Sequence, residues 1–217
     1  MAVIQLDEDL WFPNPRLGEP DGLVAVGGDL SVDRLLLAYS LGFFPWYSYK
    51  HQTEPLWFCP LDRFVIFPDE IHISHSMRQL INKHHFDVSI NSDFEGVMRG
   101  CATAQNRNQQ EGAWLGPDIV SAYTELHRQG FAASVEVWHD EQLVGGLYGV
   151  NIGNIFFGES MFSLMPNASK YALIQLATIL GQHGGKLIDC QFETDHLRSM
   201  GGRHIPYEEY MQIISTP

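Results

Sequence analysis

The amino-acid sequence predicts an α+β fold, in which a small N-terminal domain precedes a domain built on a mixed β-sheet. Segments with helical periodicity are most frequent in the first part of the chain. From about residue 131, three strand-like segments are separated by two short polar turns, and a long helical segment and one more strand follow. A meander followed by a helix and a strand is typical of a helix packed on a mixed sheet. We expect domains over residues 1–62 and 63–217, with a boundary no later than about residue 100.

The first part of the chain contains four predicted helices. In GGDLSVDRLLLAYSLGFFPW, Ser31 is a suitable N-cap and Gly42 ends the helix. Short helices are expected over residues 76–83 and 93–102, with the strand-like segment FDVSI between them. The strongest helical pattern is GPDIVSAYTELHRQG, which has a proline and an aspartate in its first turn and ends at Gly130.

The second part of the chain contains the predicted sheet. The strand-like segments are AASVEVW, LVGGLYGV and IFFGES, and the turns between them are HDEQ and NIGN. Two hairpins therefore join the three strands into a meander. Asn167 opens the helix ASKYALIQLATILGQH, whose leucines share one face, and two glycines stop it. The last predicted strand is KLIDCQF.

The composition argues against several classes of protein and site. The three cysteines form no CxxC pair, and no histidines have HExxH spacing, so we expect neither a disulfide framework nor a metal site. The N-terminal residues are acidic and no apolar run has the length of a membrane span, so we expect a cytoplasmic protein without a membrane contact. The formal net charge of −13 means that any contact with nucleic acid must be local.

The segment LIDCQF carries polar groups within an apolar strand. Side chains alternate along a strand, so Asp189 and Gln191 are expected on one face, while Ile188, Cys190 and Phe192 face the core. A thiolate nucleophile needs a nearby cation or helix N-terminus, so Cys190 is interpreted as a buried, inert cysteine. The acid and the amide either satisfy backbone groups at the strand end or belong to a functional site.

Several motifs together resemble the leucyl/phenylalanyl-tRNA–protein transferase family. They are GLVAVGGDLS, LLLAYSLGFFPWYS, GAWLGPDIVSAYTELHRQG, SVEVWHDEQLVGGLYGV, FFGESMFS, NASKYALI and HGGKLIDCQFETDHLRSMGG. The resemblance implies a GNAT-like acyltransferase domain after the small N-terminal domain. It also implies transfer of leucine, phenylalanine or methionine from aminoacyl-tRNA to proteins with N-terminal arginine or lysine, which marks them for N-degron degradation. No cofactor is implied, and we expect a monomer.

The resemblance also implies roles for individual residues. The catalytic residues would be Asp189, Gln191 and Glu159. The residues that contact the terminal adenosine of the tRNA would be Trp46, Trp114, Tyr39 and Tyr123. The pocket for the transferred side chain would be lined by Phe156, Met161, Leu147, Leu173, Ile174, Leu176 and Ile188. Separately, the basic residues that are candidates for phosphate contacts are Arg63, Arg78, Lys83 and Arg99, with His84, Arg198 and Arg203 as further candidates.

Aminolysis of an aminoacyl ester starts from an activated acyl group, so positioning can supply much of the acceleration. We expect Gln191 to accept a hydrogen bond from the attacking amine, Asp189 to orient and polarise that amine, and Glu159 to help place the ester or the cationic acceptor. Two alternatives remain. An acetyl-CoA-dependent N-acetyltransferase would need a glycine-rich pyrophosphate turn, which neither RSMGGR nor QHGGK supplies. A non-catalytic tRNA or N-degron adaptor would bind both partners without transfer.

Overall fold

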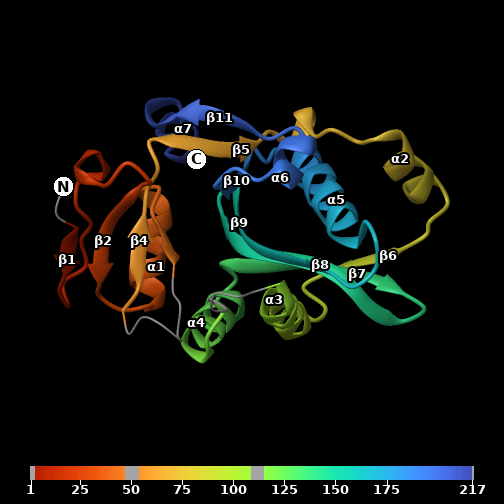
Figure 1. Ribbon diagram of the computed structural model, residues 1–217, viewed down its shortest axis with the longest axis horizontal. Helices are drawn as coiled ribbons and strands as arrows, with labels where there is room; N and C mark the ends of the chain where they lie inside the picture. Colours follow the sequence, from red (N-terminus) through yellow and green to blue (C-terminus); the bar gives the residue numbers. More distant parts are fainter. Residues whose placement is uncertain (1–2, 47–53, 109–114, 217) are drawn as a thin grey trace.

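The computed structural model describes residues 3–46, 54–108 and 115–216, with side chains for all of these except 104–108, and it contains two β-sheets (Figure 1). The smaller sheet has the strand order β1-β2-β4-β3. Its strands are β1 (Ile4–Leu6), β2 (Leu23–Gly27), β4 (Leu56–Phe58) and β3 (Phe44–Trp46). Helix α1 (Val32–Ser40) begins as expected, because the side chain of Ser31 accepts a hydrogen bond from the N–H of Arg34.

The larger sheet has seven strands in the order β11-β5-β10-β9-β8-β7-β6. Only β9 and β10 pair in parallel; the other neighbours are antiparallel, so the predicted mixed sheet and its meander β7-β8-β9 are confirmed. The strands are β11 (Arg203–Pro206), β5 (Asp62–Ile66), β10 (Leu187–Gln191), β9 (Ile155–Ser163), β8 (Gln142–Ile152), β7 (Ala132–His139) and β6 (Asp87–Ile90). The two sheets divide between Phe58 and Asp62.

Helices cover both faces of the larger sheet, with α5 on one face and α3 and α4 on the other (Figure 1). The bounds of these and the remaining helices are α2 (His75–Asn82), α3 (Phe94–Asn108), α4 (Pro117–Arg128), α5 (Ala168–Gln182), α6 (Asp195–Ser199) and α7 (Tyr207–Ile214), with short 3₁₀ helices at Pro15–Leu17 and Pro68–Glu70. Among the described residues, no helix is both long and apolar enough to cross a membrane.

The tight turns of the meander fix its register. The first turn places Asp140 and Glu141 at positive φ, as a type I′ turn requires. In the second turn only the first central residue, Gly153, has positive φ, as in a type II′ turn. These turns hold β9 beside β8 and place its residues 158–161 opposite the end of β10.

Helix α5 packs very closely on β8. A Cβ atom built on Gly145 would lie 2.5 Å from the Cβ of Ala168, in the first turn of α5. Seven side chains of α5 are buried, so this helix is apolar on most of its circumference and sits between the sheet and the segments after it. The close approach positions the α5 leucines over β8 and β9.

Strands β1 to β5 are not predicted by the sequence, which instead indicates a mainly helical first part. Each of them has only three to five residues, too few for a period-two pattern to be recognised. Helix α3 is also longer than expected, reaching Asn108.

Candidate active site

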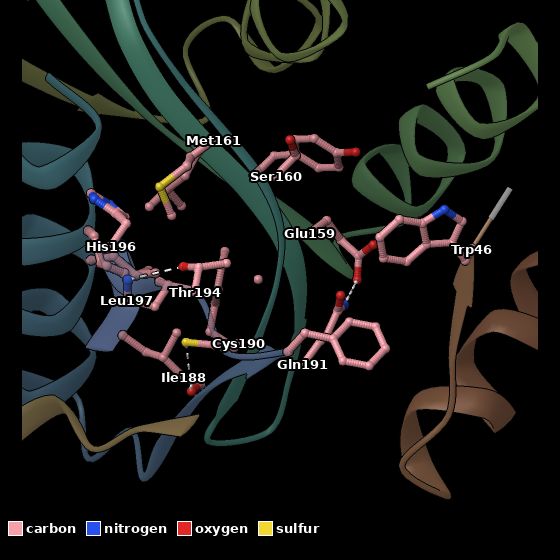
Figure 2. A pocket seen from close by; sticks show the side chains of 17 residues that line it. Trp46, Glu159, Ser160, Met161, Ile188, Cys190, Gln191, Thr194, His196 and Leu197 are labelled. Carbon is pink, nitrogen blue, oxygen red and sulfur yellow. Dashed lines mark hydrogen bonds between the residues drawn. The ribbon is translucent and has the colours of Figure 1, made fainter. Parts of the chain in front are cut away.

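A cavity of about 350 Å³ lies where β9 and β10 stop pairing. The two strands pair in parallel as far as Asp189 and Phe157, and beyond this point residues of both strands line the cavity. Figure 2 shows Trp46, Glu159 and Gln191 at one end of it, and Met161, His196 and Leu197 at the other. The size is within the range of sites for small ligands.

The interior of the cavity is mainly apolar. Six of the seven residues expected to form the side-chain pocket line it: Leu147, Phe156, Met161, Leu173, Leu176 and Ile188. The seventh, Ile174, does not line the cavity: it is 1% exposed and lies in the core cluster between α5 and the sheet. Because α5 turns by about 100° per residue, Ile174 points away from the cavity that its neighbour Leu173 lines.

The polar end of the cavity is formed by Glu159 and Gln191. The Nε2 of Gln191 donates a hydrogen bond of 2.7 Å to Oε1 of Glu159 (Figure 2). This bond uses the amide nitrogen, so the amide oxygen of Gln191 is the atom that can accept a hydrogen from a ligand. Trp46, which is 42% exposed, lies beside them and packs edge-on against Phe192 at 5.9 Å between ring centroids.

Two buried tyrosines hold the carboxylate of Glu159. The hydroxyl of Tyr39 on α1 donates to Oε1 at 2.7 Å, and that of Tyr123 on α4 donates to Oε2 at 2.9 Å. Burial raises the pKa of Glu159 to about 7, against the opposing effect of these hydrogen bonds. The expected direct contact of Tyr39 and Tyr123 with an adenosine is not supported, because both side chains are fully buried.

The residues of β10 alternate as expected up to Cys190, but the faces assigned to them are wrong. Ile188 and Cys190 line the cavity, whereas Asp189 is fully buried behind the strand. A β-bulge then shifts the register between Asp189 and Gln191, and Gln191 takes φ +65°, which brings its side chain to the cavity side. Asp189 therefore does not reach the cavity, and direct contact between its carboxylate and an attacking amine is ruled out in this conformation.

Cys190 lies at the cavity wall and not in the core. Burial raises the pKa of its thiol, with the nearby Asp189 carboxylate adding to the effect. The thiol therefore stays protonated, in agreement with its interpretation as an unreactive cysteine.

Arg63 is not available to a phosphate group. Its side chain is fully buried and forms an ion pair with Asp189, with Nη2 at 2.7 Å from Oδ2. Three other basic residues expected to contact phosphate, Arg78, Lys83 and Arg99, are exposed. Arg99 lies 3.6 Å from Asp93 and 3.5 Å from Glu95, so its charge is partly screened.

Eight of the residues that line the cavity were not expected there from the sequence, and three of the eight follow β10 directly: Thr194, His196 and Leu197. They come from the segment TDHLR, in which Thr194 caps α6 by accepting the N–H of Leu197. Thr194 as an N-cap followed by Asp195 in the first turn, directly after the strand that carries the catalytic candidates, is the signal that could have placed them near the site.

Trp114 lies outside the described residues. In the part of the chain that the structure describes, no three His, Cys, Asp or Glu side chains gather in a way that could hold a metal ion.

Comparison with known proteins gives consistent results. A family model described as leucyl/phenylalanyl-tRNA protein transferase matches residues 65–215, and a model for the N-terminal domain of that transferase matches residues 28–61. The chain is 48% identical to the leucyl/phenylalanyl-tRNA–protein transferase of Syntrophobacter fumaroxidans, over 99% of this chain and 91% of the relative. It is 51% identical to the enzyme of that name from Syntrophus aciditrophicus, over 99% of this chain and 88% of the relative.

The fold is similar to a solved structure of FemX, with a TM-score of 0.52 and 11% identity, over 85% of this chain and 71% of that one. This likeness concerns the fold alone.

Proposed function

The chain belongs to the leucyl/phenylalanyl-tRNA–protein transferase family, and from this membership we propose that it transfers leucine, phenylalanine or methionine from aminoacyl-tRNA to the N-terminal arginine or lysine of acceptor proteins. We propose further that it acts as a monomer in the cytoplasm, that residues 1–62 and 63–217 are its domains, and that the modified proteins are thereby marked for degradation.

The observation that carries the proposal is the amide of Gln191 at the polar end of an apolar cavity. The apolar part, lined by Leu173, Leu176 and Met161, fits a donor side chain that is unbranched at Cβ, as in leucine, phenylalanine and methionine. Trp46 at the same end as Gln191 offers a partly exposed ring for the terminal adenosine to stack on. The donor ester then lies next to Gln191.

In the proposed reaction, the neutral α-amine of the acceptor attacks the ester carbonyl, the C–N bond forms and the ester C–O bond breaks. The amide oxygen of Gln191 accepts a hydrogen bond from the amine and aligns its lone pair. The amine then loses a proton and the leaving ribose oxygen gains one. Because an α-amine ordinarily has a pKa of about 7.7–8, a usable fraction is neutral near pH 7.

Glu159 keeps the Gln191 amide in this orientation, because it accepts the Nε2–H. Its carboxylate also offers negative charge to an acceptor that carries arginine or lysine. Asp189 acts from behind the strand, through the backbone of Gln191 and not through the amine.

The proposal is tested by measuring transfer of labelled phenylalanine from Phe-tRNA to a peptide that begins with arginine, with a peptide that begins with glutamate and a Val-tRNA donor as negative controls. Gln191→Ala is expected to lower kcat by about 100-fold or more with little change in donor affinity. The matched control is Gln182→Ala, because Gln182 is exposed at the end of α5. Binding of both partners without transfer by the wild type would favour an adaptor, and acetyl transfer from acetyl-CoA would favour the N-acetyltransferase alternative.

A further inference from the structure

A buried polar cluster lies on the side of β10 away from the cavity, where it does not contact the substrates of the proposed reaction. It consists of Arg63 on β5, Asp189 on β10 and Tyr210 on α7, all of them 0–1% exposed. Arg63 donates to both carboxylate oxygens of Asp189, through Nε at 2.9 and 3.1 Å and through Nη2 at 2.7 Å. The hydroxyl of Tyr210 donates to Oδ2 of Asp189 at 2.7 Å.

The cluster is held in place by aromatic rings as well as by hydrogen bonds. The guanidinium carbon of Arg63 lies 4.6 Å from the ring centroid of Phe44 and 4.8 Å from that of Tyr210. A planar guanidinium with aromatic contacts and a paired carboxylate has little freedom to move. Asp189 is therefore fixed from three directions, by β5, by α7 and by its own strand.

Asp189 in turn holds the backbone of Gln191. Its Oδ1 accepts the backbone N–H of Gln191 at 2.9 Å. Gln191 has φ +65°, a region that non-glycine residues seldom occupy and that needs support from its surroundings. In a regular strand, Gln191 would point to the same side as Asp189, away from the cavity. The bond from Asp189 to the Gln191 N–H supports the bulge that turns the amide toward Glu159.

We propose that Arg63 and Tyr210 are positioning residues for the transfer reaction, which fix Asp189 so that it holds Gln191 in the bulged conformation. The expected change in kcat rests on the proposed function, because it presupposes the transfer reaction. The structural part of the inference, that Asp189 protects the backbone N–H of Gln191 from hydrogen exchange, does not depend on that function.

The first test is Tyr210→Phe, which removes one hydrogen bond from Asp189 and keeps the ring beside Arg63. The control is Tyr207→Phe on the same helix, where the side chain is half-exposed. We expect Tyr210→Phe to lower kcat by about tenfold, with KM for donor and acceptor within about twofold of the wild-type values. Hydrogen exchange of the backbone N–H of Gln191, followed by NMR, should be faster in Tyr210→Phe and unchanged in Tyr207→Phe. An unchanged kcat together with unchanged exchange would overturn the proposal.

The second test separates positioning from a direct electrostatic effect of the Asp189 charge. Asp189→Asn alone leaves Arg63 buried without a counter-charge and should be strongly impaired. The double variant Arg63→Met, Asp189→Asn has no buried charge in this cluster, and the side-chain oxygen of the asparagine can still accept the backbone N–H of Gln191. We expect kcat of the double variant to recover at least about tenfold over Asp189→Asn, with slow exchange restored at Gln191.

The proposal would be overturned if the double variant folds and protects the backbone N–H of Gln191 from exchange but stays as inactive as Asp189→Asn. This result would show that the carboxylate charge itself is required. If the double variant fails to fold in a thermal melt, Tyr210→Phe decides alone. If the wild type shows no transfer at all, the proposed function fails, while the exchange measurement still decides whether the cluster holds Gln191.

Discussion

The protonation of Glu159 depends both on its burial and on its hydrogen bonds. The Glu159 side chain accepts hydrogen bonds from Tyr39, Tyr123 and Gln191, which come from three different elements. These bonds favour the charged carboxylate, whereas burial disfavours it and prevails, so the pKa is raised to about 7. Glu159 therefore changes charge in the pH range in which the acceptor amine also does.

Tyr39→Phe should shift the pH dependence of transfer upward. The variant removes a hydrogen bond that stabilises the charged form of Glu159, so the pKa of Glu159 rises. Since the role proposed for Glu159 requires the ionised carboxylate, the rise of kcat/KM with pH should move from about pH 7 to about pH 8. The measurement is a pH profile of kcat/KM, together with the ¹³C shift of the Glu159 carboxyl carbon.

The matched control for this prediction is Tyr148→Phe. Tyr148 is fully buried in the same region, and its hydroxyl has no hydrogen-bond partner among the described residues. Its removal should leave the Glu159 inflection in place. An inflection that stays at about pH 7 in Tyr39→Phe would contradict the role assigned to that hydroxyl.

At the level of single residues, the sequence predicted most of the groups that meet at the cavity, but not the directions in which their side chains point. Gln191, Glu159 and six apolar residues do line one cavity. The bulge at Gln191 is invisible in the sequence, because it depends on an acceptor, Asp189, that is held by Arg63 from a distant strand. Arg63 could be interpreted as a phosphate contact only because its burial could not be foreseen.

At the level of elements, the cavity exists because β9 and β10 pair over a short length and then separate. Helix α5 supplies the opposite wall, and its position depends on the absence of a side chain at Gly145. The geometry of the pocket is therefore set by a helix-to-sheet contact at some distance from the polar groups.

Gly145→Ala should destabilise the protein and weaken donor binding. The new Cβ would lie 2.5 Å from that of Ala168, so α5 must move outward. We expect a loss of about 1–3 kcal/mol in the free energy of unfolding and a raised KM for the donor, because Leu173 and Leu176 move with the helix. Urea unfolding and steady-state kinetics measure both.

The double variant Gly145→Ala, Ala168→Gly is the control, because it removes the atom with which the new methyl group collides. It should recover part of the lost stability, as a coupled pair does in a double-mutant cycle. Strictly additive losses would show that the close approach at Ala168 is not what limits the position of α5.

The meander was predicted well because its patterns are long, whereas α6, β11 and α7 after it were not predicted. Strands β7, β8 and β9 have eight to eleven residues each and are bounded by polar turns. Strands β1 to β5 have five residues or fewer and are formed by pairing with partners distant in sequence, so local patterns did not reveal them.

At the level of the whole molecule, the net charge of −13 opposes the approach of a polyanion. Among the basic residues expected to contact phosphate, Arg63 is buried, whereas Arg78, Lys83 and Arg99 are exposed. Of the further candidates, His84 is exposed, and Arg198 and Arg203 are exposed but paired with Glu193 and Glu70. The proposed tRNA contact must therefore rely on the terminal nucleotide at the cavity more than on the phosphate backbone.

Binding of aminoacyl-tRNA should accordingly depend only weakly on salt. Three phosphate contacts give a slope of about −2 to −3 for the logarithm of the association constant against that of the salt concentration. Lys83→Ala should make the slope shallower by about one without changing donor preference. Fluorescence titrations between about 50 and 300 mM KCl measure the slope, and one steeper than about −5 would reveal a larger basic surface.

The link from Tyr210 to Asp189 has a consequence for the newly made protein. Tyr39 and Trp46 are synthesised early, whereas Gln191 and the hydroxyl that steadies its neighbour are synthesised near the end. A nascent chain still attached to the ribosome lacks its reactive geometry until residue 210 has emerged. Correct positioning of Gln191 is therefore reached only once α7 has been synthesised and has packed against β5.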